Sequence, residues 1–316
     1  MGVFFIKERV SGIEYPLNIN IVLYLLFVSL VIPSVLSAFY PYFPDYNNYN
    51  KYISTGSSLE RFSVEIGSAY IMHFLNSIGG TASEYYWIST FLFCFCIALV
   101  ITSFNGWGKV HFSLLLIIFM NPIFLILYQT PRFSSALGFF TLSLFYFRGS
   151  WYSLVFVLIT ASLHTVLGVF CAICVVISYF RWWLQFFSVF FIVAGFYLIT
   201  TGYIDTNYKV YDVDVYERGA GRTFLFLFNF IVFLFLSYKS KNKHFIRYSI
   251  LVSFMCLFLY LLTPFAHRMT SIALMILLVL SFSFFNKVRK LIMALALLFQ
   301  SLLGVYMLKF SLFGFG

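Results

Sequence analysis

Four arginines and two histidines of this chain lie where apolar segments begin or end. They are Arg132, His164, Arg218, Arg222, His267 and Arg268. A charge at the edge of hydrocarbon is costly unless it is paired or functional. For any single arginine the alternative is snorkelling to lipid phosphate. Guanidinium groups present forked donors that match phosphate oxygens and stay charged when partly desolvated. The set predicts a site for the diphosphate of a polyprenyl-linked ligand, bound by Arg132, Arg218, Arg222, Arg268 and His267.

A second group of residues could bind a sugar. The segment Tyr40–Tyr49 reads YPYFPDYNNY and places one carboxylate, Asp45, among aromatic rings. We expect Tyr42, Tyr46 and Tyr49 to contact sugar rings, and Asp45 to act as a general base on a sugar hydroxyl. The alternative for Asp45 is an Asx turn after Pro44. His164 is the other candidate base, or else a hydrogen-bond donor to the diphosphate.

Long apolar runs must position these residues. Eleven apolar runs are candidate membrane helices. Several of them, such as 151–163, are shorter than a full membrane span. The eleven runs are 19–39, 85–104, 112–128, 133–147, 151–163, 165–180, 182–199, 223–238, 245–262, 269–285 and 291–308. The runs predict an all-α polytopic membrane protein with about 11 transmembrane helices, forming a single integral membrane domain over residues 1–316. Its larger outer loops are expected at 40–84 and 200–222.

The charges between the runs orient the chain. If the N-terminus is cytoplasmic and the runs alternate, twelve of the 20 lysines and arginines fall inside with only two acids. The other eight basic residues fall outside with eight acids, so the net charge of +10 lies on the inner side. An excess of basic residues in short inner loops sets the orientation. The C-terminus is then expected outside.

Two local alternatives affect this topology. An outside N-terminus with residues 62–78 as an extra span gives the same basic count, but that segment carries Glu65, His73 and several other polar residues. Its apolar residues recur at helical spacing, which favours an amphipathic helix lying on the outer surface. Residues 151–180 could also form one long tilted helix. That fusion would move the basic cluster 239–247 outside, so we expect a break at His164.

Composition and motifs exclude several other classes of protein. At 62% hydrophobic residues, 9% charged residues and a mean hydropathy of +0.95, the chain cannot be an ordinary soluble globule. The five cysteines all lie in apolar runs and are expected to pack there without a metal. No phosphate-binding loop, dinucleotide fingerprint or zinc motif is present. We expect no metal, no cofactor and no nucleic-acid partner.

Four short motifs, taken in order, resemble the EpsG/Wzy group of bacterial polysaccharide polymerases. They are FPDYNNY at 43–49, EIGSAY at 65–70, RFSSA at 132–136 and ASLH at 161–164. The resemblance covers roughly residues 20–180 and implies a metal-independent glycosyltransferase of the bacterial inner membrane. The C-terminus, which the charge pattern places outside, would then be periplasmic. It adds Glu65 to the candidate catalytic residues, beside Asp45 and His164. The first loop, a carboxylate followed by a surface helix, is also similar to the opening of GT-C glycosyltransferases.

The resemblance implies a polymerase that joins undecaprenyl-diphosphate-linked oligosaccharide repeat units at the outer face, in O-antigen or capsule synthesis. Its partners would be lipid-linked glycans, membrane lipid, a chain-length regulator and a flippase. Two competing functions are open. A flippase or transporter should carry charge along a path through both leaflets and often internal symmetry. A membrane acyltransferase that modifies glycans should carry its chemistry on the inner face.

Overall fold

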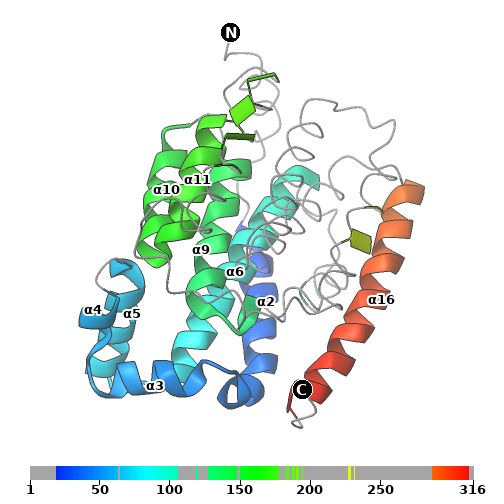
Figure 1. Ribbon diagram of the computed structural model, residues 1–316. Coiled ribbons are helices and arrows are strands. Elements are labelled where there is room, and N and C mark those ends of the chain that lie inside the picture. The colour runs from blue at the N-terminus through cyan, green and yellow to red at the C-terminus, as the bar shows by residue number, and fades with distance from the viewer. Residues whose placement is uncertain are drawn as a thin grey trace. The chain divides into compact units, whose positions relative to one another are not determined.

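A computed structural model of the chain describes residues 19–62, 65–105, 119, 127–147, 150–177 and 287–312, with isolated positions between 183 and 231. All regular structure in these residues is helical, and no strand occurs among them (Figure 1). The prediction of a helical protein is therefore confirmed for this part of the chain. The count of eleven spans stays a prediction, because most of the runs between 112 and 126 and between 178 and 286 lie outside the described residues.

Several described helices follow the apolar runs closely, and others form the first predicted outer loop. In chain order they are α2 (Ile19–Leu36), the 3₁₀ turn η1 (Ser37–Tyr42), α3 (Tyr46–Ser54), α4 (Ser58–Arg61), α5 (Ile66–Ser77), α6 (Ala82–Asn105), α9 (Pro131–Thr141), the π-helical segment η2 (Leu142–Tyr146), α10 (Tyr152–Leu163), α11 (Thr165–Ile177) and α16 (Lys287–Leu312). The expected break between two helices at His164 is confirmed, since His164 has an extended backbone (φ −154°, ψ 102°).

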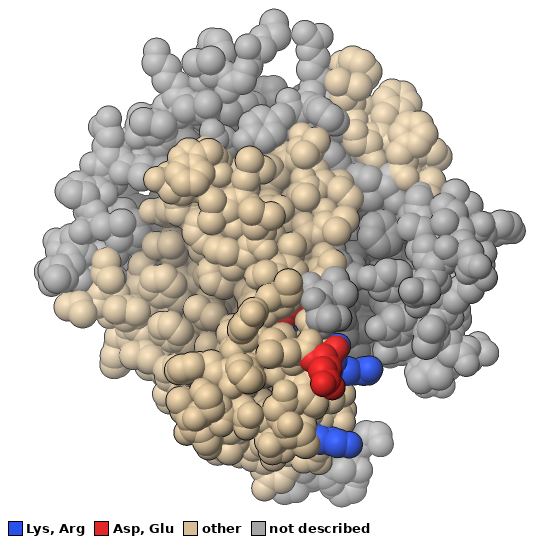
Figure 2. All heavy atoms as spheres, turned by 90° about the vertical axis from the view of Figure 1, so that its left-hand side faces the viewer, with Lys and Arg blue, Asp and Glu red and all other residues tan. Residues whose placement is uncertain are grey.

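Within the described residues, two helical segments are long and apolar enough to cross a membrane. They cover Val22–Tyr42 and Ala82–Ile101, with 21 and 20 residues. Charged side chains are also scarce on the described surface. Figure 2 shows them gathered in one small region of the visible face, while the rest of the described atoms there are uncharged. Such a surface is typical of a protein that contacts lipid.

Helix α6 lies between α2 and α9, and α9 packs in turn against α10. A glycine allows the close approach of α6 and α9, because a Cβ atom at Gly138 would lie only 3.1 Å from the Cα of Phe93. Aromatic rings fill the core, among them the stacked pair Phe140 and Phe170 with centroids 6.0 Å apart. The packing fixes the N-terminal end of α9, where Arg132 lies.

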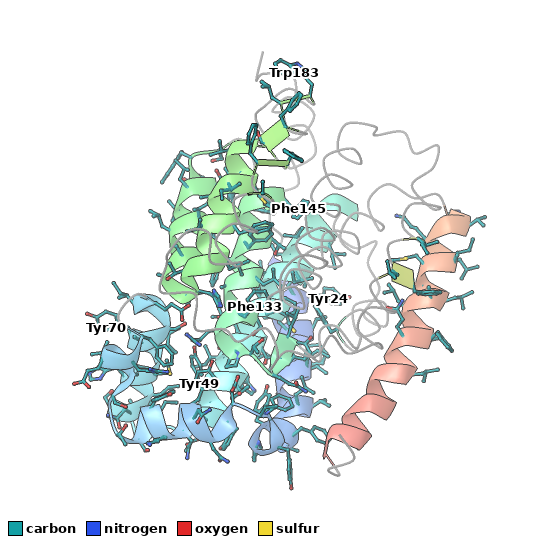
Figure 3. The ribbon with its side chains drawn as sticks, in the orientation of Figure 1. Tyr24, Tyr49, Tyr70, Phe133, Phe145 and Trp183 are labelled. Carbon is teal, nitrogen blue, oxygen red and sulfur yellow. The ribbon has the colours of Figure 1, made fainter. Side chains whose placement is uncertain are left out.

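The first predicted outer loop folds into η1, α3, α4 and α5. Helix α5 matches the expected amphipathic segment, and its two faces differ sharply. Ser68, Ala69, Met72 and Leu75 are buried. The stripe of Ile66, Tyr70, Phe74 and Ile78 is more than half exposed. Figure 3 shows Tyr70 projecting from α5 away from the other helices.

The chain divides into two compact units, residues 1–175 with 294–316, and residues 176–293. Helices α2 to α10 lie in the first unit, together with most of α11. In the second unit only isolated helical positions and the first turns of α16 are described. A single domain over residues 1–316 stays a prediction.

Candidate functional site

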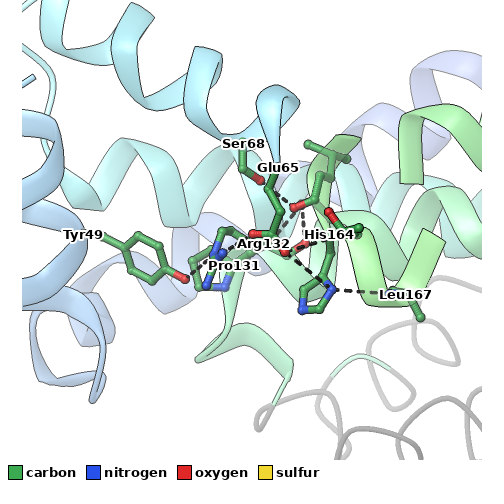
Figure 4. A network of polar contacts seen from close by, with 10 residues as sticks. Tyr49, Glu65, Ser68, Pro131, Arg132, His164 and Leu167 are labelled. Carbon is green, nitrogen blue, oxygen red and sulfur yellow. Dashed lines mark hydrogen bonds and ion pairs between the residues drawn. The ribbon is translucent and has the colours of Figure 1, made fainter. Parts of the chain in front are cut away.

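Three of the predicted site residues meet in the first unit. Glu65 precedes α5, Arg132 lies in the first turn of α9, and His164 separates α10 from α11. Figure 4 shows their side chains converging, with Tyr49 of α3 beside them. Glu65 thereby contacts Arg132, which is 67 positions away in the sequence, and Thr165, which is 100 positions away.

Arg132 is held from three directions. Its Nη1 forms an ion pair with Oε2 of Glu65, and its Nε donates a hydrogen bond of 3.0 Å to the Tyr49 hydroxyl. The guanidinium carbon also lies 4.3 Å from the centroid of the Phe62 ring, which is a cation–π geometry. Pro131 at the start of α9 fixes the local backbone, since its φ suits the first helical position and its missing N–H leaves no unpaired donor.

Part of the guanidinium remains available to a ligand. A guanidinium group has five N–H donors. Within the part of the chain that the structure describes, only Nε and Nη1 of Arg132 have hydrogen-bond partners. The side chain is 26% exposed, compared with 14% for Glu65. The Nη2 donors can therefore reach an incoming anion while Glu65 and Tyr49 hold the rest of the fork.

Three helix N-termini converge on the same place. Helices α5, α9 and α11 begin at Ile66, Pro131 and Thr165, next to Glu65, Arg132 and His164. The backbone N–H of Thr165 donates to Oε1 of Glu65 at 3.4 Å, so the carboxylate caps α11. Helix N-termini carry partial positive charge and favour anions. One carboxylate does not neutralise three N-termini together with an arginine, so the described part of the site keeps a net positive charge, which favours an anion.

The His164 ring is oriented by its own helix. The backbone N–H of Leu167 donates to Nδ1 at 3.4 Å, so His164 serves as the N-cap of α11. Nδ1 also lies 3.7 Å from Oε1 of Glu65, but this distance is beyond a hydrogen bond and would require a proton on Nδ1. We take the contact with Leu167 as the one that sets the tautomer. Nδ1 is then the acceptor, and Nε2 carries the proton of the neutral ring.

Two glycines bring the elements of the site together. A Cβ atom at Gly67 would lie 2.6 Å from Oγ of Ser162, and one at Gly168 would lie 2.2 Å from Cα of Ala161. The neighbouring Ser68 hydroxyl donates to the carbonyl of Leu163 at 2.8 Å. The contacts of Gly67 and Ser68 hold the start of α5 against the end of α10, and the contact of Gly168 holds α11 against α10. Together they place Glu65 beside His164.

Asp45 lies next to this cluster but does not join it. It precedes α3, one turn before Tyr49, and the Tyr49 N–H donates to its backbone carbonyl at 3.1 Å. Its half-buried carboxylate makes no capping bond, and no hydrogen bond or ion pair links it to another described residue. The Asx turn considered for Asp45 is therefore absent, and the carboxylate is left available.

The three tyrosines predicted to bind sugar lie in different environments. Tyr42 is 66% exposed, whereas Tyr49 is buried against Tyr85 and holds Arg132. Tyr46 stacks on Tyr86 and shares a hydrogen bond of 3.0 Å with Ser83. Tyr49 thus positions the arginine, and only Tyr42 presents an open ring.

Sequence reasoning missed two residues of the site. Phe62 lies under the guanidinium of Arg132. Tyr85 is buried against Tyr49, and its hydroxyl makes no hydrogen bond of normal geometry to another described residue. No spacing in the sequence links either residue to Arg132. The sequence offers only weak signals for them. Phe62 is an aromatic residue directly after the charged pair Glu60-Arg61, and Tyr85 is a tyrosine at the start of an apolar run.

Arg218, Arg222, His267 and Arg268 lie outside the described residues, as does most of the expected outer loop 200–222. Their part in the site stays a prediction.

Comparison with known proteins identifies one family. The model of the EpsG family matches residues 17–315, which is nearly the whole chain. No curated protein matches the chain. No solved structure matches it either.

Proposed function

This chain belongs to the EpsG family, and we propose that it is a membrane glycosyltransferase that polymerises a bacterial polysaccharide. Its substrates are oligosaccharide repeat units linked to undecaprenyl diphosphate at the outer face of the inner membrane. The product is O-antigen or capsule. Family membership supports a membrane protein of the polysaccharide polymerase type. The partly exposed guanidinium of Arg132 supports a substrate that carries a diphosphate.

The environment of Arg132 is the observation that carries this proposal. Its guanidinium is partly exposed, keeps Nη2 donors available, and lies where three helix N-termini meet. These features suit the oxygens of a diphosphate, which develops charge when it leaves. Arg218, Arg222, Arg268 and His267 are proposed as further ligands of the diphosphate.

In the proposed reaction a hydroxyl of the acceptor repeat unit attacks the anomeric carbon of the donor glycan. A glycosidic C–O bond forms, and the bond from the anomeric carbon to the diphosphate oxygen breaks. The electron pair departs with undecaprenyl diphosphate, and the hydroxyl proton passes to the base. The glycosyl–phosphate bond already holds the required free energy, so no nucleotide is needed. In this proposal the arginines, and not a metal ion, stabilise the charge on the departing diphosphate.

Asp45 is the proposed base. Its carboxylate has no described hydrogen-bond partner to hold it in a structural role, and it lies one turn from Tyr49, which holds Arg132. His164 is the proposed donor to the diphosphate, because its Nδ1 accepts from Leu167 and its proton therefore lies on Nε2. Glu65 is proposed to orient both Arg132 and the start of α11. Tyr42 is the proposed sugar contact.

We further propose a GT-C-like arrangement of about 11 transmembrane helices, with a cytoplasmic N-terminus and a periplasmic C-terminus. The basic residues of the inner loops support this orientation. A chain-length regulator and a flippase are the proposed protein partners.

The decisive experiment is the surface polysaccharide profile of a deletion strain. We expect loss of the polymer ladder with a single repeat unit retained, restored by the wild-type gene and not by Arg132→Gln. Loss of every repeat unit from the surface would instead indicate a flippase. An intact ladder with a changed repeat unit would indicate a modifying acyltransferase.

A further inference from the structure

Helix α10 is too short to cross a membrane. It has twelve residues, which at 1.5 Å per residue cover about 18 Å of a hydrocarbon core of about 30 Å. It begins after Trp151, an exposed aromatic residue of the kind found at membrane interfaces, and it ends at Leu163 beside the site. Its exposed side, with Leu154 and Leu158, is apolar. The end of α10 at the site therefore lies well inside the bilayer if Trp151 lies at the opposite interface.

Helix α5 continues from this end. The Ser68 hydroxyl bonds the Leu163 carbonyl, and Gly67 lies against Ser162, so the first turn of α5 packs on the last turn of α10. In Figure 1, α5 extends from the lower end of α10 in the same general direction, while α3 crosses beneath. Helix α5 also has twelve residues, so the stacked pair covers about 36 Å, enough to cross the membrane.

The exposed surface of α5 is suited to lipid. Ile66, Tyr70, Phe74 and Ile78 are exposed by 53%, 60%, 59% and 62%. No lysine, arginine, aspartate or glutamate occurs from Ile66 to Gly80. Large apolar side chains exposed at every turn, without a charge, are characteristic of a surface that contacts acyl chains.

The polarity of α5 changes along its axis. A helix that lies flat on a membrane buries one face in lipid and turns a polar face to water. In α5 the face opposite the exposed stripe is buried in protein, at Ser68, Ala69, Met72 and Leu75. Its exposed polar side chains, His73 and Ser77, are in the second half of the helix, away from Glu65. This gradient fits a helix whose first turn is deep and whose last turn is at the interface.

We propose that α5 enters the outer leaflet as a half-length helix stacked end to end on α10, with its stripe of Ile66, Tyr70, Phe74 and Ile78 in contact with lipid acyl chains. The site of Glu65, Arg132 and His164 then lies at the break between the two helices, below the membrane surface. This placement of α5 does not depend on which reaction the site catalyses. It differs from the flat surface helix that the amphipathic pattern predicts.

Depth measurements on the full-length protein test this placement. Single cysteines at positions 66, 70, 74 and 78 are spin-labelled in phosphatidylethanolamine–phosphatidylglycerol vesicles, and collision rates with oxygen and a water-soluble nickel chelate give the depth of each label. We expect depth to increase steadily from 78 to 66, with a difference of about 18 Å between the two ends. Leu158→Cys on α10 is the lipid-exposed control and Asn47→Cys, exposed on α3, is the water-exposed control. The wild-type chain, whose described cysteines are buried, gives the background.

Equal depths at the four positions would show a flat helix and overturn the proposal. Nickel accessibility equal to that of Asn47→Cys at all four would place α5 in water and overturn it too. In case a labelled variant fails to insert, the rate of reaction with a membrane-impermeant maleimide is compared in intact cells between Ser77→Cys and Ile66→Cys. We expect fast reaction at 77 and none at 66, and equal rates would contradict the inserted helix.

Discussion

The Nε of Arg132 donates a hydrogen bond of 3.0 Å to the hydroxyl of Tyr49, although the two residues are 83 positions apart. The Tyr49 ring is held in turn by Tyr85, with centroids 5.4 Å apart. A planar guanidinium needs a fixed orientation to offer its donors in pairs. The tyrosine core of the first outer loop therefore determines which side of Arg132 faces a ligand.

Tyr49→Phe tests this dependence. The substitution keeps the ring but removes the acceptor, and a hydrogen bond to a charged group contributes about 1.5–3 kcal/mol. We expect polymerisation in isolated membranes to fall roughly 10- to 100-fold with protein levels unchanged. Tyr70→Phe, at an exposed position in the same outer loop, is the control for loss of a phenol hydroxyl. Equal effects of the two changes would mean that Tyr49 does not position Arg132.

Arg132→Lys tests whether the fork of the guanidinium matters. Lysine keeps the charge but offers no pair of parallel donors. We expect Arg132→Lys to lose nearly as much polymer as Arg132→Ala, measured as ladder length at matched protein levels. Arg61→Lys, at an exposed position, should keep full activity. Full activity of Arg132→Lys would mean that charge alone suffices, as it would for an arginine that only snorkels to lipid phosphate.

Apolar periodicity and charge predicted much of the described fold. The runs located α2, α6, α9, α10, α11 and α16 to within a few residues, because a membrane helix must be apolar along its whole length. Charge asymmetry favoured the break at His164, which the extended backbone there confirms.

Contacts between residues far apart in the chain could not be predicted from the sequence. The pairing of Glu65 with Arg132 depends on how α5, α9 and α10 pack, and no spacing encodes it. Tyr49 was interpreted as a sugar contact because aromatic rings in a loop suggest one, but burial against Tyr85 gives it a positioning role. The role of Gly67 likewise depends on the packing of α5 against α10, because the distance to Ser162 is what excludes a side chain there.

Gly67→Ala should move Glu65, at the start of α5, away from His164, at the end of α10. The new methyl group would meet Oγ of Ser162 at 2.6 Å, and overpacking typically costs about 1–3 kcal/mol. We expect a lower melting temperature in detergent and weaker polymerisation, with partial rescue by Ser162→Ala. Gly168→Ala is the matched comparison, because its methyl group would meet the backbone of Ala161 at 2.2 Å. No side-chain change at position 161 should rescue it, and a rescue there would contradict the assigned contact.

Cysteine labelling from outside the cell tests the proposed topology. An impermeant reagent should reach cysteines at Asn47, Asn207 and Ala266. It should miss cysteines at Lys109, Lys241 and Val288. The expectation follows from twelve of the 20 basic residues lying in the inner loops. Reaction at the second group in intact cells would show that the orientation is wrong, and permeabilised cells control for reactivity.

The final prediction separates the proposed base from the proposed donor. Asp45→Asn keeps the size of the side chain but removes the basic oxygen, and a general base typically contributes about 10²- to 10⁴-fold in rate. We expect a normally inserted protein that yields only single-repeat product. His164→Asn should retain partial polymerisation, because Nε2 supplies one hydrogen bond to a diphosphate that Arg132 also binds. Both variants are compared by ladder length at equal protein levels. Normal polymer from Asp45→Asn together with an inactive His164→Asn would assign the base to His164. Nε2 would then have to be unprotonated to accept the hydroxyl proton, so the proton of the neutral ring would lie on Nδ1.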